Sequence, residues 1–97
     1  MILTTTDSIE GFKILEYKGI VSGISVNVQK MKMTFNMDKY YQAISESMSL
    51  VKEQAFQQLK DNALKLNANA IVGIKVDIEL ITSNITGSVT GTAVFVA

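Results

Sequence analysis

The sequence contains no cysteine, histidine, arginine, tryptophan or proline. Without thiol and imidazole side chains, the chain can form neither a disulfide nor a Cys/His metal site. The same absence excludes the Cys–His and Ser–His pairs of nucleophilic enzymes. Without arginine there is no bidentate donor for a phosphate group. We therefore expect a protein that is not an enzyme and that has no cofactor.

Charge of either sign is scarce and balanced, with nine lysines against nine acidic residues. Surfaces that bind nucleic acid or anionic lipid carry excess positive charge, so we expect neither partner. No apolar run approaches the ~20 residues that a spanning helix needs. The first residues also lack the basic and apolar regions of a signal peptide. These features predict a cytoplasmic protein.

Apolar residues, by contrast, are abundant for so short a chain. The 97 residues indicate one domain, 1–97, and 47% of them are hydrophobic while 19% are charged. A domain of this size buries only a modest part of its surface on its own. Residues 93–97 are also apolar on both faces of an expected strand and should be covered. We therefore expect the chain to associate with copies of itself.

The period of the hydrophobic residues predicts the order β-β-α-β-β. Residues 12–18 and 20–28 are strand-like, and residues 3–6 could add a short strand. Gly19 and Gly23 interrupt the run and indicate a bulge or a close approach of the backbone. Apolar residues three or four apart predict a helix between about residues 34 and 69. Residues 72–80 and 88–96 alternate again as strands. This order predicts an α+β domain of two layers, an antiparallel sheet with one long helix.

The expected helix is long for its domain. About 30 residues would span about 45 Å, whereas a compact domain of this length has a radius of gyration of about 13 Å. Either the helix bends or breaks near residues 36–45, or part of it reaches outside its own domain. Asn67 or Asn69 could adopt the left-handed conformation that ends a helix.

Acidic residues are the main candidates for a binding site. Asp77 and Glu79 lie two apart on an expected strand, so both carboxylates point to one face, beside Lys75. They could bind a hard cation or act as an acid/base pair, or they could simply form a solvated strand surface. Glu16, beside Tyr17, could take part in proton chemistry or pair with a lysine.

Several motifs together resemble the YbjQ-like family of bacterial proteins. They are Thr5-Thr6, Glu10-Gly11, Glu16-Tyr17, Gly19–Gly23, Ala68–Ile74 and Val89–Val94. The resemblance implies a dodecin-like α+β subunit that assembles into a ring, expected to be a pentamer. Members of this family have no known function and carry a heavy-metal-binding label. The chain departs from the family between Val28 and Ser47, where glycine and arginine are common in other members and absent here.

Two functions remain open at this point. The first is a homo-oligomeric ring that binds a small ligand or ion between its subunits. The second is a divalent-metal or heavy-metal protein, with side-chain oxygens repeated around the ring as ligands. The metal ligands predicted for it are Asp77, Glu79, Glu16 and Glu10.

Overall fold

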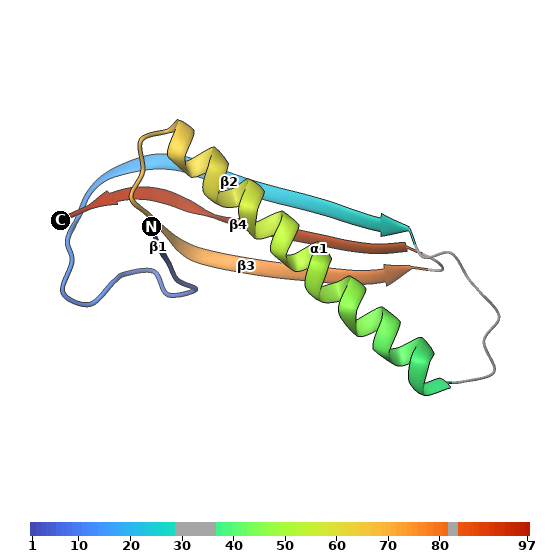
Figure 1. Ribbon diagram of the computed structural model, residues 1–97. Coiled ribbons are helices and arrows are strands. Elements are labelled where there is room, and N and C mark those ends of the chain that lie inside the picture. The colour runs from blue at the N-terminus through green and yellow to red at the C-terminus, as the bar shows by residue number, and fades with distance from the viewer. Residues whose placement is uncertain (29–36, 82–83) are drawn as a thin grey trace.

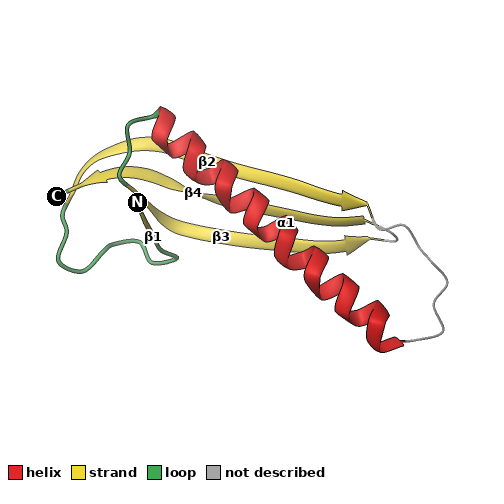
Figure 2. Ribbon diagram, in the orientation of Figure 1, coloured by secondary structure: helices red, strands yellow, loops and turns green. Residues whose placement is uncertain are grey.

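The computed structural model describes residues 1–28, 37–81 and 84–97. Their elements follow the predicted order and are β1 (Ile2–Leu3), β2 (Ile14–Val28), α1 (Met37–Lys65), β3 (Ala70–Ile81) and β4 (Asn84–Val96). Within this part of the chain, one helix lies across one face of a four-stranded sheet (Figures 1 and 2). The α+β fold with two layers is therefore confirmed.

The sheet is mixed, which corrects the prediction of a wholly antiparallel one. Its strand order is β1-β3-β4-β2, and β4 runs antiparallel to both of its neighbours. The short β1 runs parallel to β3, pairing Ile2 with Ala70 and Leu3 with Ile71. A parallel pair is possible here because β1 and β3 are far apart in sequence, so no tight hairpin has to join them.

The two runs predicted at residues 12–18 and 20–28 form the single strand β2, which begins at Ile14. Its register with β4 shifts twice before Gly19, whose φ is 138°. After Gly19 the pairing is regular as far as Val28. The predicted interruption is thus a bulge inside one strand.

Helix α1 runs unbroken from Met37 to Lys65. Of the two expectations for it, the one that holds is that part of the helix reaches outside its own domain. Its first half lies beyond the edge of β3, and its second half lies over β2 (Figure 1). The radius of gyration is accordingly 16.4 Å and the longest dimension 55 Å. Just past the helix, Asn67 has the expected left-handed conformation, with φ 61°.

The main core lies between the second half of α1 and the sheet. Val51, Ala55, Leu59 and Ala63 on the helix are fully buried. The helix comes so close to β2 that a Cβ atom at Gly23 would collide with the carbonyl oxygen of Ala55. We call the side of the sheet under α1 the helix face and the other side the open face.

A smaller core covers one end of the open face. It joins buried residues of β3 and β4 to three half-buried residues, which are Ile2 in β1, Ile9, and Ile14 at the start of β2. Val72 belongs to this core because Gly73, with φ 62°, lies at a bulge that places Val72 opposite Thr92. Ala93, Val94 and Val96 are buried. The prediction that residues 93–97 are covered is right for these three, but the cover comes from the same chain.

Candidate functional site

Asp77 and Glu79 lie in the part of β3 that the small core leaves uncovered. Both side chains are exposed. They lie directly opposite Ser88 and Thr86 on β4, and directly opposed residues of an antiparallel pair share a face. The two carboxylates therefore stand beside two hydroxyl groups on the open face.

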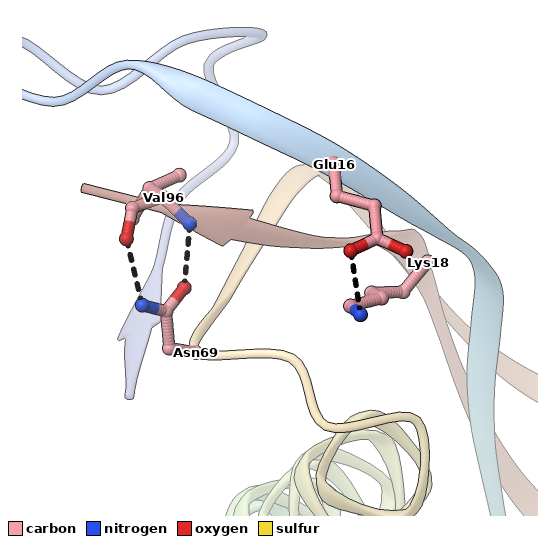
Figure 3. Close-up of polar contacts among 4 residues, drawn as sticks. All are labelled: Glu16, Lys18, Asn69 and Val96. Carbon is pink, nitrogen blue, oxygen red and sulfur yellow. Dashed lines mark hydrogen bonds and ion pairs between the residues drawn. The ribbon is translucent and has the colours of Figure 1, made fainter.

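The structure does not bring the other two predicted ligands to this place. Glu16 pairs with Phe95, about seven residues along β4 from Ser88, which corresponds to about 23 Å at 3.3 Å per residue. Its carboxylate is 2.9 Å from the Lys18 ammonium group (Figure 3). Glu10 is exposed in the segment before β2. Among residues 1–28, 37–81 and 84–97, no three acidic, histidine or cysteine side chains are grouped as metal ligands.

Soft heavy metals find only methionine thioethers among the side chains of this chain. Such metals prefer thiolate, thioether or imidazole ligands, and the sequence has neither cysteine nor histidine. Carboxylate and hydroxyl oxygens suit hard cations, which take six or more oxygen ligands. Among the described residues, the open face of one copy offers only Asp77 and Glu79 as acidic ligands in this place, so these residues alone cannot complete such a site.

The open face carries three parallel columns of side chains. The column on β3 is charged, the column on β4 consists of hydroxyl residues, and the column on β2 is apolar. In that order, the members are Lys75, Asp77 and Glu79; Thr86, Ser88, Thr90 and Thr92; and Ile20, Ile24, Val26 and Val28, with the polar Ser22 between the first two. The apolar column is exposed, from 55% at Val26 to 85% at Ile20. The sequence predicts the alternation in β2 but gives no sign that its large apolar residues face away from the helix.

A groove of about 420 Å³ lies on the helix face, between the first half of α1 and β3. Tyr41, Ile44 and Met48 line it from the helix and Ile78 from the strand, with Ser45, Ser49 and Lys52 beside them. We call this the distal groove. The helical period identifies Tyr41, Ile44 and Met48 as one face of a helix. It does not show that this face extends past the edge of the sheet.

Comparisons with known proteins find relatives that match the whole chain. A family model described as "Putative heavy-metal-binding", that of the YbjQ proteins, matches residues 1–97. A UPF0145 protein of Persephonella marina is 39% identical, with 99% of each chain covered. A UPF0145 protein of Clostridium kluyveri is 38% identical, covering 84% of this chain and 82% of its own. The names of these relatives give no activity.

A solved structure has the same architecture. It is a crystal structure of a protein of unknown function in the DUF74 family, from Pediococcus pentosaceus. It superposes with a TM-score of 0.74 at 22% identity, covering 100% of this chain and 98% of that one. Separately, no helix among the described residues combines the length and hydropathy that crossing a bilayer requires.

Proposed function

Because the chain belongs to the YbjQ family, we propose that it is the subunit of a cytoplasmic homo-oligomeric ring, expected to be a pentamer. The ring is its functional form and holds a small ligand or ion between subunits. In such a ring, neighbouring copies would cover apolar surface that a single copy leaves exposed.

The observation that carries the proposal is the apolar column on β2. Ile20 is 85% exposed and Val28 66% exposed, although buried Ile and Val side chains each contribute about 1.5–3 kcal/mol. Covering the column is therefore worth several kcal/mol. The tail residues 93–97 no longer support association, but this column does.

The β2 column and the distal groove are two different uncovered apolar surfaces among the described residues. The β2 column lies on the open face, and the distal groove lies on the helix face. A contact between unlike surfaces is heterologous, and heterologous contacts close into rings when the rotation permits. A two-fold dimer would instead use one surface twice. The two different surfaces therefore favour a ring.

Native mass spectrometry with light scattering tests the ring. At micromolar concentration we expect a multiple of the 10.6 kDa chain, five copies in the expected case, together with any small molecule retained from purification. A monomer at this concentration would overturn the proposal.

A divalent-cation site is the second candidate, and it depends on the ring. Asp77 and Glu79 share the open face with the Thr86 and Ser88 hydroxyls, and repetition around an axis would multiply these oxygens. Calorimetry with Ca²⁺, Zn²⁺, Cu²⁺ and Ni²⁺ should give heat that is lost in an Asp77→Asn/Glu79→Gln variant. Absence of heat with all four ions, or equal heat with the variant, would reject this site.

A further inference from the structure

The outer edge of β2 is covered by helix side chains in its middle. The Asn62 side-chain amide donates to the carbonyl oxygen of Ser22 at 2.8 Å. The Gln58 side-chain oxygen accepts from the N–H of Ile24 at 3.1 Å. Main-chain groups alternate in direction along a strand, so those of Val26 and Val28 also point away from β4. The helix blocks this edge at residues 22–24, and its second half does not extend to the end of the strand (Figure 1).

The outer edge of β3 is covered in the same partial way. β1 pairs with Ala70 and Ile71. The Gly73 N–H then donates to the Thr6 carbonyl at 2.8 Å, and the Ile74 N–H donates to the Thr4 carbonyl at 3.1 Å. For residues 75–81, the described part of the chain provides no strand on this side of β3.

The two uncovered stretches match in place and in direction. Val28 and Ile81 both pair with Asn84, so the open stretches lie at the same end of the sheet. Both strands are antiparallel to β4, so they run the same way. Unpaired edges of this kind readily accept a strand from another chain.

The position of α1 favours one partner for the edge of β3. The first half of the helix lies past this edge (Figure 1), and the distal groove opens between that half and Ile78. A strand added beside β3 would extend the sheet under the overhanging helix and cover the groove. The edge of β2 is the matching strand that a second copy supplies.

We propose that residues 25–28 of β2 in one copy pair in parallel with residues 75–81 of β3 in the next copy, beneath the first half of that copy's α1. The proposal rests on the ring proposed above and names its joint. Each copy offers one edge and accepts the other, so every copy has two neighbours and the contact is heterologous. Val26 and Val28 would then lie beside the charged column of the neighbouring copy, so this joint covers the distal groove and one flank of these two residues, while the rest of the β2 column stays on the continuous open face.

Cysteine cross-linking tests the joint without interference, because the chain has no cysteine of its own. Three double variants combine Val26→Cys with Asp77→Cys, Glu79→Cys or Ile81→Cys, which samples the register. Within one copy, Val26 and Glu79 both pair with Thr86 from opposite sides, about 9.6 Å apart at two strand spacings. A disulfide needs Cα atoms within about 6.8 Å, so any that forms joins two copies.

We expect at least one double variant to give a covalent ladder of multiples of 10.6 kDa on a non-reducing gel, whereas the single variants stay uncross-linked. An oligomer by light scattering with no ladder in any double variant would overturn the joint but not the ring. Dimers from the single Val26→Cys variant would overturn it too, because they show β2 paired with β2. A monomer would overturn both proposals. If Val26→Cys loses the native circular dichroism, Val28→Cys on the same face replaces it.

Discussion

At the scale of single residues, the contact between α1 and β2 depends on the absence of a side chain. A Cβ atom at Gly23 would collide with the Ala55 carbonyl and come within 3.0 Å of the Leu59 nitrogen. Both are main-chain atoms of the helix, so neither can turn aside as the end of a flexible side chain could. The helix can approach β2 this closely only while residue 23 is glycine.

Gly23→Ala should therefore lower the free energy of unfolding by about 1–3 kcal/mol, the usual cost of overpacking. Urea denaturation followed by circular dichroism measures the loss. Ser22→Ala is the matched control on the same strand, with an exposed side chain, and should change stability by less than about 0.5 kcal/mol. Equal stability of the two variants would contradict the close contact.

The side chain of Asn69 forms the two hydrogen bonds that the main chain of a neighbouring strand would form. Its amide nitrogen donates to the Val96 carbonyl and its amide oxygen accepts from the Val96 N–H, both at 2.8 Å (Figure 3). These bonds extend the pairing of β4 beyond Ala70, where β3 begins. The end of the central strand is thereby held.

Asn69→Ala should lower the free energy of unfolding by about 1–3 kcal/mol, because both main-chain groups of Val96 lose their partner. Asn69→Asp keeps an acceptor for the Val96 N–H but places an oxygen against the Val96 carbonyl, so it should not restore stability. Thermal denaturation compares the three proteins. Wild-type stability in Asn69→Asp would show that the donated bond is unimportant.

At the scale of elements, the second half of α1 both covers a core and protects an edge. Gln58 and Asn62 bond to main-chain groups of β2, and the Gln54 side-chain oxygen accepts from the Ser25 hydroxyl at 2.5 Å. Edge strands with open main-chain groups invite unwanted pairing. Polar side chains of the helix limit that possibility to the end of β2.

Gln58→Ala should make the Ile24 amide exchange its hydrogen faster, by about fivefold if the bond contributes about 1 kcal/mol. Hydrogen exchange measured by NMR tests this. The amide of Gly23, which by the strand alternation faces β4, is the internal control and should keep its rate. Unchanged exchange at Ile24 would mean that Gln58 does not protect the edge.

The sequence predicts features that depend on local backbone geometry and does not predict those that depend on long-range packing. Alternation identified β3, and the four-and-three spacing identified α1, because both are local consequences of backbone geometry. The face that packs against the helix is not local. In β2 the small residues Gly23 and Ser25 lie under α1, whereas Ile24 and Val26 lie on the open face, so hydrophobicity alone would choose the wrong side.

For the candidate site, too, the sequence predicted local features but not long-range ones. The spacing of Asp77 and Glu79 correctly predicted a shared strand face. Glu16 and Glu10 could not be placed relative to them, because distance across a sheet depends on strand order and register. The distal groove also escaped prediction, since it depends on where a straight helix crosses the sheet. Met31 and Met33, whose thioethers could also bind a soft metal ion, lie outside the described residues together with the rest of residues 29–36.

At the scale of the whole molecule, the association that we propose uses the open ends of two edge strands. Val26→Pro removes an N–H that points away from β4, so the pairing of β2 with β4 can persist, as proline is tolerated on the outer side of edge strands. We expect it to convert the oligomer to the 10.6 kDa chain, whereas Val26→Ala remains assembled. Light scattering distinguishes the two. An oligomer of unchanged mass in Val26→Pro would show that this edge is not used.

The position of β4 between β2 and β3 also affects how the protein folds during its synthesis on the ribosome. β2 leaves the exit tunnel early, but its neighbour in the sheet is synthesised only after the whole of α1 and β3. A nascent chain that stops before residue 84 has no strand to join β2 to β3. The sheet must then form in one late step, and such distant pairings close slowly.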